Sequence, residues 1–105
     1  MEQMERIQTM EQALDRAQAA VSALSEALDA YCGVLPDLKA LDAYLQSDEW
    51  KADYASDEAG ALPAELKRGV LSEDGIYDLL TENGALRKRL AAVAADRKRR
   101  KRTQA

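Results

Sequence analysis

Residues 7–31 read IQTMEQALDRAQAAVSALSEALDAY and carry the clearest pattern in the chain. Residues at spacings of three and four lie on one face of an α-helix, so this pattern is a heptad repeat with apolar a and d positions. No glycine or proline occurs before Gly33. We therefore predict one continuous helix from about residue 2 to about residue 32, whose seam is formed by Ile7, Met10, Leu14, Ala17, Val21, Leu24, Leu28 and Tyr31.

Small residues flank this seam. The g positions of the repeat are Ala13, Ala20 and Ala27, where a parallel two-stranded coiled coil usually carries charges that select its partner. Alanines at these positions widen the apolar stripe and let another backbone approach closely. The pattern favours an antiparallel helical hairpin or a small bundle over a simple zipper, although alanine is also a good helix former on a surface.

The middle of the chain predicts shorter elements. Gly33 and Pro36 interrupt the heptads, and helical spacing then returns, so the long helix is predicted over about residues 2–46 with a kink or break near 33–36. Ser47 is a good N-cap and predicts a short helix over about residues 48–57. Gly60, Pro63 and Gly69 predict a loop over residues 58–71.

A second long helix is predicted over about residues 73–96. Ser72 opens it, with Glu73 and Asp74 in its first turn. Asn83 occupies a core-type position of its seam, and the Asn83–Gly84 pair is alternatively a turn that breaks the helix. We favour a continuous helix, because the same spacing of apolar residues continues on both sides in the seam Ile76, Leu79, Asn83, Leu86, Leu90 and Val93.

These elements predict an all-α fold: a long antiparallel helical hairpin, or coiled-coil-like bundle, with a short helix and a loop in the middle. A single helical domain over residues 1–96 precedes a basic C-terminal tail, residues 97–105. Two long helices bury little surface for 105 residues, so a symmetric dimer that completes a four-helix bundle is expected.

The net charge of −4 hides a strong asymmetry. Residues 1–86 hold 18 acidic and 6 basic side chains, whereas residues 87–105 hold 9 basic and one acidic. A basic end on an acidic body favours contact with an anionic partner or with an acidic patch of another copy. Because the N-terminus does not resemble a signal peptide and no run approaches the ~20 apolar residues of a membrane span, we expect a soluble cytoplasmic protein.

Composition argues against several kinds of catalytic site. The chain has no histidine and a single cysteine, Cys32, which excludes a Cys/His zinc site, a Ser-His-Asp triad and an internal disulfide framework. We therefore expect no enzymatic activity, no catalytic residue, no cofactor and no small-molecule substrate.

Residues 50–80 read WKADYASDEAGALPAELKRGVLSEDGIYDLL, which is more distinctive than any heptad. This stretch resembles a family of small bacterial proteins known as the domain of unknown function 4298 family. The similarity extends over most of the chain to about Val93 and implies a helical cytoplasmic bacterial protein. It implies no activity, substrate or catalytic residue. The matching residues are Trp50, Asp57–Gly60, Leu62–Pro63, Leu66–Asp74 and Ile76–Leu80.

Three groups of residues could carry a function. Glu49, Asp53 and Asp57 share one helix face and could hold a divalent cation, although a solvated acidic face is the simpler interpretation. The second group is a possible partner surface, in which the aromatic residues are also expected as packing anchors and the basic pair as partners of acidic side chains. It comprises Trp50, Tyr54, Lys67, Arg68 and Tyr77.

The third group is the basic end. A dense cationic run binds nucleic-acid phosphates without reading sequence, and no aromatic residue is interleaved to stack on bases. The residues that could make this contact are Arg97, Lys98, Arg99, Arg100, Lys101 and Arg102.

The function that the sequence favours is a protein–protein interaction or scaffold module that self-associates, as a dimer or with another helical protein. A non-specific nucleic-acid-binding protein that uses the basic tail is the alternative. A metal-binding protein or small enzyme built on the acidic residues is the least favoured.

Overall fold

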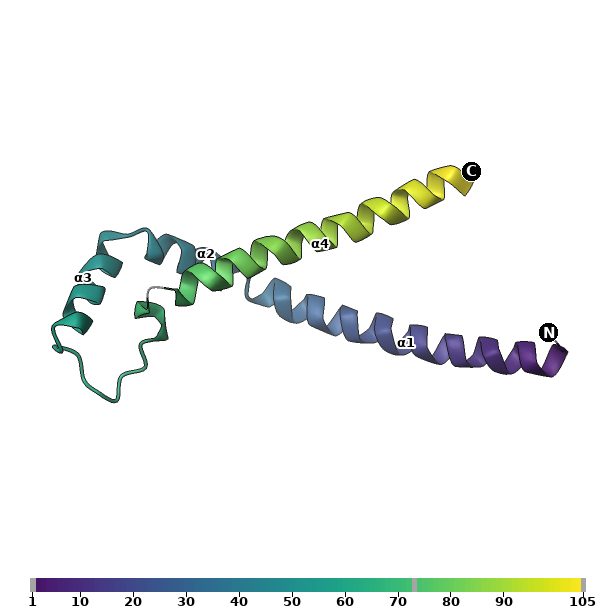
Figure 1. Ribbon diagram of the computed structural model, residues 1–105, viewed down its shortest axis with the longest axis horizontal. Coiled ribbons are helices and arrows are strands. Elements are labelled where there is room, and N and C mark those ends of the chain that lie inside the picture. Colours follow the sequence, from purple (N-terminus) through teal and green to yellow (C-terminus); the bar gives the residue numbers. More distant parts are fainter. Residues whose placement is uncertain (1, 73, 105) are drawn as a thin grey trace. The chain divides into compact units, whose positions relative to one another are not determined.

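The computed structural model describes residues 2–72 and 74–104, and side chains as far as residue 96. Within these residues lie four α-helices and no strand, which confirms the predicted all-α class. The helices are α1 (Gln3–Gly33), α2 (Leu35–Leu45), α3 (Asp48–Glu58) and α4 (Gly75–Gln104), with a 3₁₀ turn, η1 (Gly69–Leu71), between the last two (Figure 1). The chain divides into two units, Met1–Asp37 and Leu38–Ala105.

The first unit is dominated by α1. The Glu2 side chain caps its start by accepting a hydrogen bond from the Met4 N–H at 2.9 Å. The helix ends at Val34, whose N–H donates to the Tyr31 carbonyl at 3.1 Å. Pro36 then falls in the first turn of α2, where its missing N–H leaves no hydrogen bond unmade. The break therefore lies inside the predicted interval 33–36.

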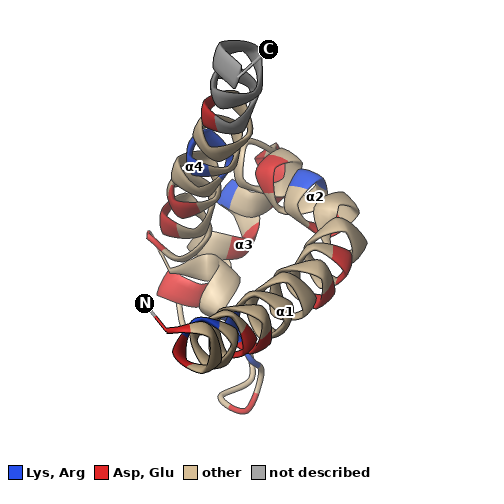
Figure 2. Cartoon of the chain, turned by 90° about the vertical axis from the view of Figure 1, so that its right-hand side faces the viewer, with Lys and Arg blue, Asp and Glu red and all other residues tan. Residues whose placement is uncertain are grey.

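No residue of α1 is buried. Leu14, Val21 and Leu28 keep 49%, 69% and 38% of their surface exposed. The predicted burial of this apolar stripe is therefore not found within the first unit. The reason is physical: a lone amphipathic helix cannot cover its own apolar face, and the heptad pattern does not specify what covers it. Acidic side chains outnumber basic ones on the polar faces of α1 (Figure 2).

In the second unit, α3 has well-defined ends. The Ser47 hydroxyl accepts a hydrogen bond from the Trp50 N–H at 3.2 Å, which confirms the predicted N-cap. Past the other end, Gly60 has a φ of +71°, while the Ala61 N–H donates to the Ser56 carbonyl and the Gly60 N–H to the Asp57 carbonyl. This is a Schellman motif, and its left-handed residue favours glycine.

The segment between α3 and α4 is more ordered than the predicted loop over residues 58–71, because it contains η1. The Ser72 hydroxyl donates to the Gly69 carbonyl at 2.9 Å and accepts from the Gly75 N–H at 3.0 Å. A Cβ at Gly75 would lie 2.6 Å from the Gly69 carbonyl oxygen, so the chain needs glycine here. Glu73, predicted in the first turn of the last helix, lies outside the described residues.

The last helix is continuous through Asn83 and Gly84, as the phase of its seam predicts. It continues to Gln104, beyond the predicted end at about residue 96. No glycine or proline follows Gly84, and lysine, arginine and alanine are good helix formers, so nothing in residues 97–104 terminates the helix. None of the described helices is long and apolar enough to cross a membrane.

The core of the second unit is small. Leu71 and Ile76 are the buried hydrophobic residues among those described, at 6% and 3% exposure. Leu71 ends η1 and Ile76 begins α4, and η1 contacts both α3 and α4. The core therefore lies around η1.

Candidate functional site around Trp50 and Arg68

Trp50 joins α3 to η1. Its indole N–H donates a hydrogen bond to the Val70 carbonyl at 2.9 Å, and its ring stacks on Tyr54 with ring centres 5.1 Å apart and planes inclined by 22°. Both aromatic residues are half-buried. A buried or half-buried indole usually needs such an acceptor, so the Val70 carbonyl fixes the position of the ring. We call Trp50, Tyr54, Asp57, Arg68 and Val70 the Trp50 cluster.

Arg68 closes the same cluster from the loop side. One guanidinium nitrogen lies 2.7 Å from a carboxylate oxygen of Asp57, and the other donates to the Ala64 carbonyl at 3.4 Å. The two charged side chains keep 32% and 23% of their surface exposed. A partly exposed pair of this kind contributes modestly to stability, and less at high salt. Its main effect is to hold the loop against α3.

Tyr44 and Asp53 link α2 to α3. The Tyr44 hydroxyl donates to an Asp53 carboxylate oxygen at 2.7 Å. This hydrogen bond, with smaller contributions from burial and from the negative charge of Asp53, raises the pKa of Tyr44 to about 12. Tyr44 therefore stays protonated across the physiological range and acts as a fixed donor.

The acidic residues of α3 are divided between these contacts. Of the three carboxylates predicted on one face, Asp53 accepts from Tyr44 and Asp57 pairs with Arg68, while Glu49 lies exposed in the first turn. No group of three or more side chains suited to a metal ion occurs in the described part of the chain. Two of the three carboxylates thus make specific contacts between elements. The pairing of Arg68 with an acidic side chain was expected, whereas the bond from Tyr44 was not.

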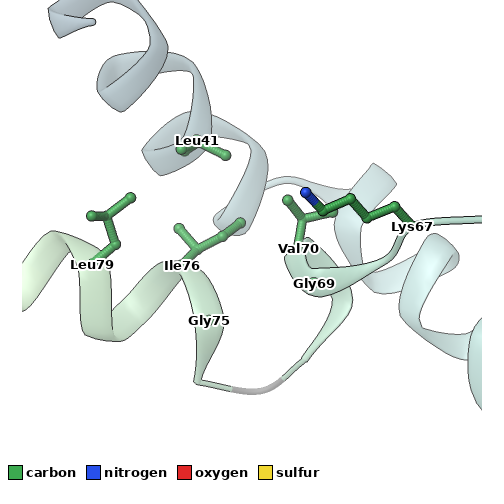
Figure 3. Close-up of a pocket in the computed structure, with 7 residues that line it drawn as sticks. All are labelled: Leu41, Lys67, Gly69, Val70, Gly75, Ile76 and Leu79. Carbon is green, nitrogen blue, oxygen red and sulfur yellow. The ribbon is translucent and has the colours of Figure 1, made fainter. Parts of the chain in front are cut away.

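A groove lies between α2, η1 and α4. It has a volume of about 330 Å³, and Figure 3 shows Leu41 of α2 across from Ile76 and Leu79 of α4, with Val70 and Lys67 at the far end. The walls are apolar, and Lys67 supplies a single amine at the rim. Such a groove suits an apolar side chain better than a polar reactant. Its lining residues are Leu41, Lys67, Gly69, Val70, Gly75, Ile76 and Leu79.

The predicted partner-surface residues have different environments. Trp50, Tyr54 and Arg68 lie together in the Trp50 cluster. Lys67 is exposed at the rim of the groove, and Tyr77 lies on α4 with 62% of its surface exposed. The side chains of the predicted nucleic-acid contact, Arg97, Lys98, Arg99, Arg100, Lys101 and Arg102, lie outside the described residues.

Of the two buried residues among those described, Ile76 was predicted on the apolar seam of the last helix, but Leu71 was not singled out. Leu71 directly precedes Ser72, whose hydroxyl accepts a hydrogen bond from the Gly75 N–H, and Ile76 lies four residues after Ser72. This is the spacing of a hydrophobic staple. That spacing was readable from the sequence. The Tyr44–Asp53 bond and the Trp50–Val70 bond were not, because they join residues 9 and 20 positions apart with no motif between them.

Residues 7–92 match the family model described as Domain of unknown function (DUF4298). The chain belongs to this family. The match begins at the first seam residue of α1 and includes the Trp50 cluster, η1 and most of α4, which confirms the resemblance seen in the sequence. The basic residues 97–102 of this DUF4298 chain lie beyond it. No curated protein and no solved structure is significantly similar to the chain.

Proposed function

We propose that this DUF4298 protein is a self-associating helical interaction or scaffold module, in which a second copy covers the apolar stripe of α1. The observation that carries the proposal is the exposure of that stripe within the first unit. Ile7, Met10 and Leu24 are 52%, 58% and 53% exposed, in line with Leu14, Val21 and Leu28. Contiguous exposed apolar side chains of this extent usually mark an interaction surface.

The energetic argument rests on the imbalance between buried and exposed apolar residues. Burial of one Leu, Ile, Val or Met side chain contributes roughly 1.5–3 kcal/mol. Covering the whole stripe with a partner helix would therefore stabilise the assembly considerably. The described core holds only Leu71 and Ile76. A heptad repeat is the surface through which the helices of a coiled coil pair, and a second copy presents the same repeat.

The role is that of a structural module rather than an enzyme. In the Trp50 cluster and beside it, the polar groups are committed to contacts within the fold: Asp53 to Tyr44, Asp57 to Arg68, and the Trp50 indole to a backbone carbonyl. We place this module in a reducing compartment such as the bacterial cytoplasm. The family resemblance and the lone exposed Cys32 support that assignment.

Light scattering coupled to size exclusion tests the proposal. We expect the 11.6 kDa chain to elute with twice that mass, and the Leu14→Glu variant with the mass of one chain, because a buried carboxylate in the stripe is costly. Gln12→Glu is the matched control: it adds the same charge two residues away, on the polar face, and should leave the dimer intact. A single-chain mass for the unmodified protein at high concentration would overturn the proposal.

A further inference from the structure

We propose that the C-terminal half of α4 binds duplex DNA without reading its sequence, as a helix in the major groove between the phosphates of its two walls. The proposal is independent of self-association, because it concerns a different helix and a different chemistry. It concerns residues 87–104, which we call the basic segment. This segment holds nine basic residues and one acidic residue, Asp96.

The basic segment is part of a helix rather than a separate tail. α4 runs without interruption from Gly75 to Gln104, so at 1.5 Å per residue the basic segment is about 26 Å of helix (Figure 1). A segment that is already helical loses less conformational entropy on binding than a flexible chain does. This favours binding in the helical form.

The described side chains at the start of the basic segment carry charge that α4 does not neutralise. Arg87, Lys88 and Arg89 are exposed, and no acidic residue occurs three or four positions before or after any of them. Among the described elements of the second unit α4 contacts η1, and the buried Ile76 there lies about 16 Å along the helix axis from Arg87. Within the second unit, these three cations are therefore open to an anionic partner.

The apolar seam of α4 ends where the densest run of charge begins. Leu86, Leu90 and Val93 follow one another at spacings of four and three. The next positions on that face are Arg97 and Arg100, so the face becomes basic. A helix that binds a membrane surface needs an apolar face opposite its cations, and this end of α4 has none. The pattern therefore argues against a lipid surface as the partner.

The distribution of the cations around the helix favours a partner that surrounds it. Residues 97–102 are six consecutive basic positions of a helix with 3.6 residues per turn, so they occupy its whole circumference. A flat anionic surface, on a membrane or on an acidic protein, meets only one side of such a helix. The major groove of B-DNA is about 12 Å wide and admits a helix of roughly 10–12 Å diameter between two rows of phosphates.

Two further features favour duplex DNA over other nucleic acids. No aromatic residue occurs in the basic segment to stack on unpaired bases, which argues against a single strand. The major groove of double-stranded RNA is deep and narrow, so it does not admit a helix in the same way.

The acidic remainder of the chain confines the contact to the basic segment. Residues 1–86 hold 18 acidic and 6 basic side chains, which DNA phosphates repel. Glu82, the last acidic residue before the basic segment, lies about 22 Å along the helix axis from Arg97. This exceeds the screening length of about 8 Å at physiological ionic strength, so the repulsion at Arg97 from this part of the chain is weak.

The test is a titration of fluorescently labelled duplex DNA of roughly 20 base pairs with the full chain, followed by anisotropy. Each neutralised phosphate contributes about −0.9 to the slope of log affinity against log salt concentration, so six to nine contacts predict a slope of about −5 to −8. We expect equal affinity for duplexes of different sequence and weaker binding to duplex RNA. No binding at low salt, or an affinity that does not change with salt, would overturn the proposal.

A charge variant with a matched control locates the contact. Glutamine keeps the helix propensity and removes the charge. The basic-segment variant combines Arg97→Gln, Arg99→Gln, Arg100→Gln and Arg102→Gln. The control removes the same number of charges from exposed positions elsewhere and combines Arg6→Gln, Arg16→Gln, Lys39→Gln and Lys51→Gln.

The two variants have the same net charge but different expected affinities. The basic-segment variant should bind at least about tenfold more weakly at low salt, with a salt slope smaller by about 3–4. The control should bind like the unmodified chain. Equal losses in both would show that total charge, and not the basic segment, determines binding, and would overturn the proposal. Circular dichroism of both variants checks that α4 stays helical.

Competition identifies the groove and the class of partner. Methyl green occupies the major groove and should displace the chain, whereas distamycin, also a cation, occupies the minor groove and should not. Displacement by distamycin alone would overturn the major-groove geometry. Vesicles of equal parts phosphatidylserine and phosphatidylcholine, and polyglutamate, stand for a lipid surface and an acidic protein. Tighter binding to either of them than to duplex DNA would overturn the choice of DNA as partner.

Discussion

The helix α1 and the Trp50 cluster use the same kinds of side chain with opposite results. Over 31 residues α1 buries none, although its apolar pattern is the most regular in the chain. Around η1 a much shorter stretch contains the two residues that are buried in the described part of the chain, a stacked aromatic pair, an ion pair and two helix ends with specific caps. The regular heptads of α1 thus form an exposed apolar surface, whereas the irregular contacts around η1 form a small core.

The two regions also differ in what fixes their conformation. The Trp50 cluster is held by contacts within one chain, from Trp50 to Val70 and from Asp57 to Arg68. In α1 the helical hydrogen bonds are internal, but the stripe has no cover within the first unit. A change in the cluster should therefore alter the stability of the second unit, and a change in the stripe should alter the mass of the assembly.

The largest expected effect comes from the core. Ile76→Ala removes a side chain that is 3% exposed and should lower the free energy of unfolding by about 3 kcal/mol, through lost burial and the cavity left behind. Trp50 is the single tryptophan, so its fluorescence in a urea titration reports this region directly. Tyr77→Ala, one residue along and 62% exposed, is the control and should shift the transition little.

Trp50 fluorescence and the assembly mass together distinguish changes in the second unit from changes in α1. Leu14→Glu should change the assembly mass and leave the Trp50 transition in place, whereas Ile76→Ala should do the reverse. If both variants changed both the assembly mass and the Trp50 transition equally, α1 and the Trp50 cluster would form one cooperative structure rather than two independent regions.

The next effect lies at the end of α3. Gly60→Ala places a Cβ on a residue with a φ of +71° and should cost about 1–2 kcal/mol. Gly84→Ala is a control of opposite sign: Gly84 lies inside α4 with no atom within 4 Å of a new Cβ, so alanine should stabilise by about 0.5–1 kcal/mol. Thermal unfolding followed by circular dichroism measures both. A neutral Gly60→Ala would mean that the Schellman motif does not hold this end.

The sequence was sufficient for the local features. Heptad spacing predicted α1, Gly33 and Pro36 predicted its break, and Ser47 predicted the cap of α3, because each depends on residues close together in the chain. The constant phase of the apolar positions also predicted that α4 continues through Gly84.

Features that depend on distant residues were not predictable. Nothing near Trp50 indicates that its indole bonds to the Val70 carbonyl, and nothing near Asp53 indicates its bond to Tyr44. The pairing of Arg68 with an acidic side chain was expected, but the sequence did not single out Asp57 as its partner. The end of α4 was predicted too early for a different reason. The charge of residues 97–102 suggested a separate tail, but no residue there breaks the helix before Gln104.

A smaller effect should come from the ion pair of the cluster. Asp57→Asn removes the charge that faces Arg68 at 2.7 Å and should lower stability by about 0.5–1 kcal/mol at low salt, since both groups are partly exposed. In 1 M salt the difference should shrink, because ions screen the pair. Glu58→Gln, the exposed neighbour, is the matched control for the loss of one negative charge. A difference that does not change with salt would show that Asp57 acts through packing.

The smallest effect at neutral pH should come from Tyr44→Phe, with a loss of about 0.5–1 kcal/mol for the hydrogen bond to Asp53. Its pH dependence identifies it. The pKa of Tyr44 is raised from 10.0 to about 12 in the folded chain, so the unfolded chain loses this proton first as pH rises. The stabilising contribution is therefore complete below about pH 10 and disappears as pH rises through about 12.

Urea titrations of both proteins, followed by Trp50 fluorescence between pH 8 and about pH 12, measure this difference. Subtracting the variant from the unmodified protein removes the titration of the other tyrosines and of the lysines, which the two share. We expect the difference to be constant at first and then to fall to zero. A difference that stays constant to the highest pH would show that the Tyr44 hydroxyl does not donate to Asp53. The contact between α2 and α3 would then depend on packing of the Tyr44 ring alone, and the second unit would have one fewer specific contact between its helices.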